Sequence, residues 1–139
     1  MLIQNSNKYI FIKFNTLITD NEFSKFLQLW KDLYLLKNEF IFIFDTRNIK
    51  YSNNLLKYSI QMTKFIKELK KESIQYLQRS IILLDKMYIS YLLDFMFEIE
   101  KPVADIYLWT TKTQNYQNIM LISKNILNIK SKNITKIYP

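Results

Sequence analysis

The stretch Phe40-Ile41-Phe42-Ile43-Phe44 is followed at once by Asp45, and a second stretch, Ser80-Ile81-Ile82-Leu83-Leu84, is followed by Asp85. A strand with one face in water would alternate apolar and polar side chains. A nearly unbroken apolar run instead predicts a strand that is buried on both faces. Such strands are typical of parallel sheets covered by helices, so these two stretches predict an α/β fold.

The rest of the chain supplies strands and helices in alternation. β-forming composition predicts strands at residues 9–14, 40–44, 80–84 and 105–109. Capping residues and apolar side chains with a 3.6-residue period predict helices at about residues 20–34, 54–69, 87–97 and 116–127. This β-α-β-α-β-α-β-α order predicts a four- to five-stranded, mostly parallel sheet with right-handed crossovers and helices on its faces.

Length and composition fit a single domain. The chain has 139 residues, of which 49% are hydrophobic, and it contains no internal repeat and no Pro- or Ser-rich linker. We therefore expect one domain over residues 1–139, with a basic tail at about 130–139. No signal-like segment is evident, and no uncharged apolar run approaches the ~20 residues of a membrane span. The predicted location is the cytoplasm.

The residue usage is strongly biased. Eighteen of the 20 basic residues are lysine, glycine is absent, and alanine and valine occur once each, at Ala104 and Val103. Lysine, asparagine, isoleucine, phenylalanine and tyrosine have A/T-rich codons, so the bias predicts an AT-rich genome, such as that of a giant virus, a protist or a bacterium. A viral protein could also be associated with the virion. A net charge of +8 normally indicates an anionic partner, but codon bias weakens that inference here.

The order of elements resembles the STAS fold (sulfate transporter and anti-sigma-factor antagonist domains) and the related STAS/CRAL-TRIO-like group, over about residues 8–125. The segments that carry the resemblance are Glu22–Tyr34, Phe40–Ile49, Ser80–Leu84 and Lys101–Val103. A flavodoxin-like or receiver-like domain is the alternative. The resemblance implies that the protein binds partner proteins.

STAS-like domains also switch by phosphorylation of a Ser or Thr that begins the helix after the second strand. The corresponding stretch here is Tyr51-Ser52-Asn53-Asn54. Asn53 and Asn54 align best with the phosphorylated pair and cannot accept phosphate. Ser52, one or two positions away, is the remaining candidate phosphosite.

Missing residue types exclude much enzyme chemistry. Without glycine there is no phosphate-binding P-loop and no dinucleotide fingerprint. Without histidine and cysteine there is no imidazole base, thiol nucleophile or usual transition-metal site. We therefore predict a non-enzymatic protein with no cofactor and no metal.

Two carboxylates remain as a candidate ligand site, because Asp45 and Asp85 both follow buried strands. Ligands of open α/β sheets bind at the carboxyl ends of the strands, and two carboxylates there could hold Mg²⁺ or accept a phosphoryl group. The simpler interpretation is that both aspartates end their strands and accept hydrogen bonds from loop amides.

The segment at about residues 87–97 is apolar nearly all round, which indicates a helix buried on several sides or in contact with a partner. Its candidate partner-binding residues are Tyr88, Tyr91, Leu92, Phe95 and Met96. The partner would be a second copy or another protein. Two alternatives stay open: the chain's own C-terminal segment covers this helix, or the helix contacts a lipid or other apolar ligand.

Lysines line the outer face of the helix at residues 54–69. The candidate anion-binding residues are Lys57, Lys64, Lys67 and Lys71. They could bind the phosphates of a nucleic acid or an anionic membrane. Plain exposure to solvent is the alternative interpretation.

Overall fold

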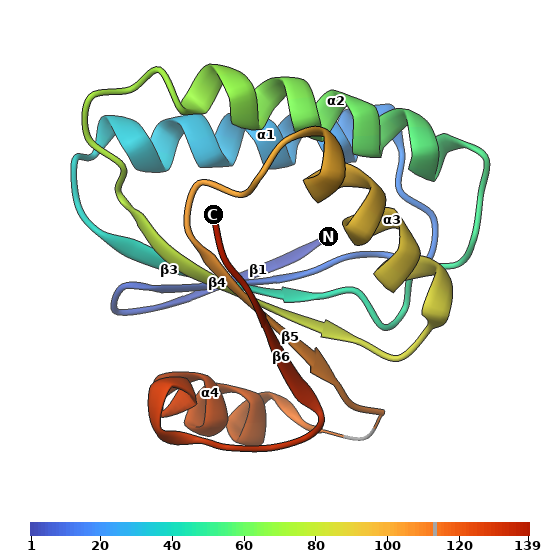
Figure 1. Cartoon of the computed structure of the whole chain (residues 1–139), viewed down its shortest axis with the longest axis vertical. Coiled ribbons are helices and arrows are strands. Elements are labelled where there is room, and N and C mark those ends of the chain that lie inside the picture. The colour runs from blue at the N-terminus through green and yellow to red at the C-terminus, as the bar shows by residue number, and fades with distance from the viewer. Residues whose placement is uncertain (113) are drawn as a thin grey trace.

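Figure 1 shows the computed structural model of the chain, in which one β-sheet separates two layers of helices. The structure describes residues 1–112 and 114–139. The elements in chain order are β1 (Leu2–Ser6), β2 (Tyr9–Lys13), α1 (Asp20–Leu35), β3 (Phe40–Asp45), α2 (Asn54–Leu69), β4 (Leu77–Leu84), α3 (Met87–Ile99), β5 (Asp105–Thr110), α4 (Tyr116–Lys124), the 3₁₀ turn η1 (Ile126–Asn128) and β6 (Ile134–Ile137).

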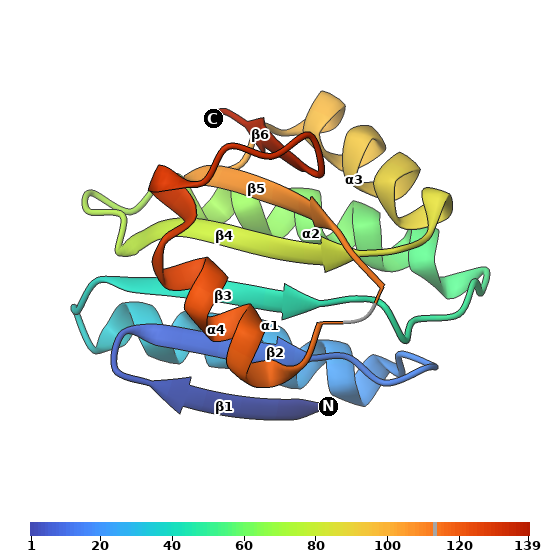
Figure 2. The same cartoon turned by 90° about the horizontal axis from the view of Figure 1, so that it is seen from below.

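The sheet has six strands in the order β1-β2-β3-β4-β5-β6. Strands β2 to β5 are parallel, whereas β1 on β2 and β6 on β5 are antiparallel. Each of the strands β3, β4 and β5 lies in the sheet beside the strand that precedes it in the chain. Because all crossovers then advance in one direction with the same hand, α1, α2 and α3 share one face of the sheet, and α4 lies on the other (Figures 1 and 2).

The predicted α/β class and β-α alternation are confirmed, but the predicted number of strands is wrong. The two additional strands, β1 and β6, form the edges of the sheet. All but one of the residues of β1 are exposed, and β6 lies in the Lys/Asn-rich segment that was predicted to be a tail. An edge strand is held by hydrogen bonds to one neighbour and needs no continuous apolar run, so hydrophobic patterning does not reveal it.

Two residues take over a role that glycine usually performs. Asn7, in the tight turn between β1 and β2, and Lys37, just after α1, have φ values of 58° and 56°. Asparagine tolerates this left-handed region better than most residues and is favoured in short hairpin turns. Lysine has no such preference for the left-handed region. Lys37 adopts this conformation just after the end of α1, where helices commonly finish with one left-handed residue.

The alternating side chains of β3 supply both sides of the core. Phe40, Phe42 and Phe44 point toward α1–α3, whereas Ile41 and Ile43 point toward α4, and all five are buried. The prediction of strands buried on both faces is therefore confirmed for β3. Within the described part of the chain, no helix has the length and apolar character needed to cross a membrane.

Candidate functional site

Helix α3 leaves a row of large apolar side chains in solvent. Met87, Tyr91, Phe95 and Ile99 recur at every fourth position, and their exposed fractions run from 39% for Phe95 to 66% for Met87. Residues four apart lie on the same side of a helix, so the four form a continuous stripe. The opposite side of α3 is anchored in the core, where Ile89, Met96 and Phe97 are buried.

Helix α2 extends this apolar surface. Leu56 and Ile60 are exposed, with fractions of 50% and 39%. Ile60 also lines a shallow groove between the helices, whose other walls are Thr63, Lys64 and Lys67 of α2 and Phe95, Ile99 and Glu100 of the α3 end. We call the surface formed by Leu56, Ile60, Met87, Tyr91, Phe95 and Ile99 the α2–α3 face.

The two helices are tied together at one end of this surface. Lys70 Nζ, just after α2, lies 2.6 Å from Glu100 Oε1, just after α3. At the other end, the ring of Tyr51 packs edge-on against that of Tyr88 with centroids 6.0 Å apart. Contacts at both ends therefore hold α2 and α3 together beneath the α2–α3 face.

Opposite charges flank the α2–α3 face. Lys57 and Lys64 are exposed on α2, and Lys71 is exposed just after it. The Lys57 ammonium pairs with Asp20 of α1 at 2.9 Å, which places it on the side of α2 away from α3. Asp94 and Glu98 are exposed on α3. Asp94 directly precedes Phe95, and Glu98 directly precedes Ile99, both of which line the groove. Successive residues are about 100° apart around a helix, so the two carboxylates point away from the groove and α2. The surface thus passes from a basic ridge, whose Lys64 also lines the groove, across the apolar stripe of α3 to an acidic flank.

The residues predicted to bind a partner divide into two groups. Tyr91 and Phe95 point outward, whereas Met96 is buried in the core and Leu92 packs against it. Tyr88 is half-buried, and its hydroxyl donates a hydrogen bond to the Ile49 carbonyl.

The exposed residues that sequence reasoning missed are Met87 and Ile99, together with Leu56 and Ile60 of α2. The four-residue spacing from Met87 to Ile99 is a signal that could have found the first two, had the predicted helix extended to residue 99. The C-terminal segment, proposed as an alternative cover for this helix, pairs with β5 as strand β6, and the stripe stays exposed.

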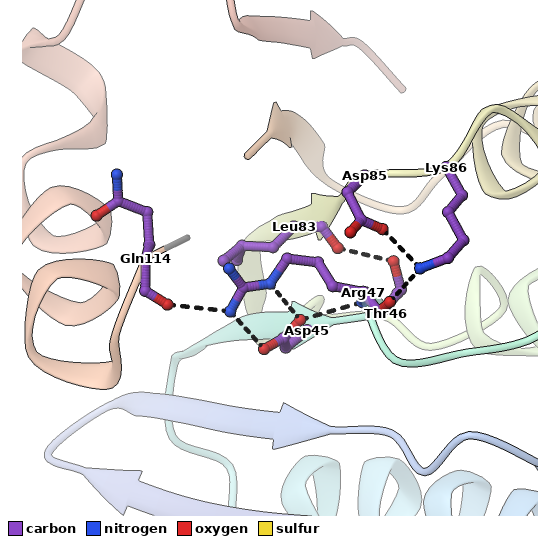
Figure 3. Close-up of polar contacts among 7 residues, drawn as sticks. All are labelled: Asp45, Thr46, Arg47, Leu83, Asp85, Lys86 and Gln114. Carbon is purple, nitrogen blue, oxygen red and sulfur yellow. Dashed lines mark hydrogen bonds and ion pairs between the residues drawn. The ribbon is translucent and has the colours of Figure 1, made fainter. Parts of the chain in front are cut away.

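The second candidate site lies at the carboxyl ends of β3 and β4, where polar side chains form a closed cluster (Figure 3). Asp45 is only 2% exposed. Arg47 Nε donates a hydrogen bond to Asp45 Oδ1 and Arg47 Nη2 donates one to Oδ2, both at 2.9 Å. The same guanidinium donates to the Gln114 carbonyl at 3.2 Å. Arg47 therefore occupies both oxygens of the carboxylate.

The neighbouring groups are partnered in the same way. Lys86 Nζ donates to Asp85 Oδ1 at 2.9 Å and to the Arg47 carbonyl at 2.5 Å. The Thr46 hydroxyl donates to the Leu83 carbonyl at 2.7 Å. Burial alone would raise the pKa of Asp45, but the hydrogen bonds and the charge of Arg47 outweigh it and hold this pKa below its ordinary value.

This arrangement favours the simpler interpretation of the two aspartates. The Arg47 amide donates to Asp45 Oδ1 at 3.1 Å, as expected for a carboxylate that ends a strand and accepts from a loop amide. Arg47 stands where a cation would have to bind Asp45. Among the described residues, no group of three or more Asp or Glu side chains gathers that could hold a metal ion.

The remaining candidates are dispersed. Of the predicted anion-binding lysines, Lys57 pairs with Asp20 and Lys71 with Glu68, at 2.9 and 3.0 Å, while Lys64 and Lys67 line the α2–α3 groove. Ser52 is half-buried just before α2, and its carbonyl accepts a hydrogen bond from the Leu55 amide.

The sequence was compared with protein-family models and with curated proteins. No protein-family model matches the sequence, and no curated protein is significantly similar to it. The resemblance to STAS-like domains therefore stays a prediction from the order of elements.

Proposed function

We propose that this protein is a non-enzymatic interaction module that self-associates through the α2–α3 face. The observation that supports the proposal is the exposed stripe of Met87, Tyr91, Phe95 and Ile99. Large contiguous patches of exposed apolar surface are uncommon on monomers and mark contact sites, and aromatic and Met side chains are favoured in interfaces. The resemblance to STAS-like domains, which bind partner proteins, supports the same class of function.

The charges beside the stripe favour a second copy as the occupant. Symmetric dimers bring the same patch of both subunits together. A two-fold axis running along the groove lays α2 of one copy on α3 of the other. This places the basic ridge, which includes Lys64, against the acidic flank of the second copy, formed by Asp94 and Glu98. The apolar stripes meet at the centre, so both charge and polarity are complementary.

The first experiment compares two glutamate variants by analytical ultracentrifugation. Tyr91→Glu should weaken dimerisation by at least about 100-fold, because symmetry buries the unpaired charge twice. Leu121→Glu is the matched control, since Leu121 is also an exposed helical residue, 63% against 62% for Tyr91, but it belongs to α4 on the other face of the sheet. A wild-type protein that stays monomeric at about 100 μM, or a Leu121 variant that dissociates equally, would refute the proposal.

A charge exchange then tests the orientation of the two copies. Lys64→Glu alone and Glu98→Lys alone should each weaken the dimer, because each places like charges opposite one another. The double variant exchanges the two signs and should recover much of the wild-type affinity. Additive weakening in the double variant would contradict the proposed two-fold arrangement.

A further inference from the structure

A cavity lies on the inner side of α3, opposite the exposed stripe. It occupies about 180 Å³ between the sheet and helices α1, α2 and α3. Trp30 of α1, Met62 of α2 and Leu92, Leu93 and Met96 of α3 are among the residues that line it.

Small side chains on β4 and just before β5 help to leave this space. Ser80 of β4 lies between Phe42 and Ile106 in the register of the parallel strands, and all three are buried. Ser80 and Ala104 both line the cavity. Helix α3, which also lines the cavity, is steeply inclined to α1 and α2 (Figure 1). Two small residues therefore stand where larger side chains would reach the inner surface of α3.

The chemistry of the lining selects for apolar molecules. None of the described residues that line the cavity is charged. The hydroxyls of Thr46 and Ser59 donate to the carbonyls of Leu83 and Leu55, at 2.7 and 2.8 Å. The Tyr58 hydroxyl donates to Asp20 Oδ1 at 2.7 Å. These three donors are used within the chain, whereas Nε1 of Trp30 is buried and has no hydrogen-bond partner among the described residues. Because the described lining offers no charged group, a charged ligand would lose its hydration here with little in return.

We infer that this cavity is a binding site for a small, uncharged apolar ligand about the size of a single aromatic ring. Dry apolar cavities of about 150 Å³ lined by Leu, Ile and Phe are large enough to bind benzene. The inference goes beyond the proposed self-association and rests on different residues, since the inner side of α3 lines the cavity and its outer side forms the stripe.

Benzene is the probe for this site, and the two tryptophans provide a local readout. Trp30 lines the cavity, whereas Trp109 packs on the opposite face of the sheet. In a Trp109→Phe variant, benzene should therefore change the fluorescence of Trp30. At about ten times its Kd, benzene should raise the Tm by about 4 °C. Benzoate should bind much more weakly than benzene, because the described lining has no charged group to pair with its carboxylate.

Filling the cavity tests whether benzene binds there. Ser80→Leu should fold, melt at or above the wild-type Tm and lose the response to benzene. Ile119→Val, in the cluster under α4, should lower the Tm but retain the full response. If Ser80→Leu does not fold, Met62→Phe replaces it as the filling variant. No response of the wild-type protein to benzene, or an equal response after filling, would overturn the inference.

Discussion

The strand-end cluster and the α2–α3 face contrast in how their chemical groups are satisfied. In the cluster, Asp45 is buried and both of its oxygens accept hydrogen bonds from Arg47. On the α2–α3 face, Tyr91 and Ile99 keep more than half of their surface in solvent. Each region contains residues that the sequence indicates as functional candidates. Of the two, only the α2–α3 face has side chains that are free to contact another molecule.

This difference separates a structural role from a functional one. A buried charge requires a partner of opposite charge. Here Arg47 of the same chain is that partner, so the Asp45 carboxylate stabilises the loop after β3 and is not available to a ligand. Exposed apolar surface stabilises nothing in the monomer, whereas burial of that surface by another molecule is favourable. The two regions should therefore respond in opposite ways to substitution.

Removing Arg47 should have the largest effect on stability. Arg47→Ala leaves the Asp45 carboxylate buried without its cation and should cost about 3 kcal/mol of unfolding free energy. Urea denaturation would measure this loss, and adding Asp45→Asn to the same chain should recover part of it. A loss below about 1 kcal/mol would show that the cluster is no more important than a surface ion pair.

Acid should weaken the same cluster. Because the pKa of Asp45 is lower in the folded protein than its ordinary value, the ion pair stabilises the fold above the ordinary pKa of about 4. That contribution should be lost as the pH falls from about 4 through the lower, folded-state pKa. Denaturation across this range would measure the slope, which Asp45→Asn should flatten. Equal slopes in both proteins would assign the acid sensitivity to other carboxylates.

Alkali should act on the contact between α1 and α2 that supports the α2–α3 face. The hydrogen bond to Asp20, together with burial, raises the pKa of Tyr58 to about 12. The protonated phenol stabilises the fold fully below the unfolded-state pKa of about 10, and this contribution should be lost between about pH 10 and 12. Phenolate absorbance would follow the titration, and Tyr58→Phe should remove this part of the pH dependence. Titration of every tyrosine near pH 10 would contradict it.

The smallest change in stability is expected on the α2–α3 face itself. Tyr91→Gln should change the unfolding free energy of the monomer by no more than about 0.5 kcal/mol, because this side chain is mostly exposed. Urea denaturation at concentrations below the dimer Kd would test it. A loss as large as that of Arg47→Ala would remove the contrast between the two regions.

Local pattern was sufficient for the central elements of the fold. β3 and the apolar part of β4 are short runs whose burial follows from their composition, and the alternation of strands and helices then favours parallel pairing. It was not sufficient for β1 and β6. Their pairing depends on backbone hydrogen bonds to β2 and β5, and the pattern of side-chain hydrophobicity does not predict those bonds.

The candidate sites divide in the same way. Composition and spacing alone predict that the helix near residue 90 has more apolar surface than one contact can bury, and that Asp45 and Asp85 follow strands. The packing of the helices on the sheet shows that Tyr91 and Phe95 face outward while Met96 faces the core, and the loop after β3 brings Arg47 onto Asp45. The physical reason is that helical spacing relates residues of one element to each other, whereas burial and charge pairing depend on which elements pack together.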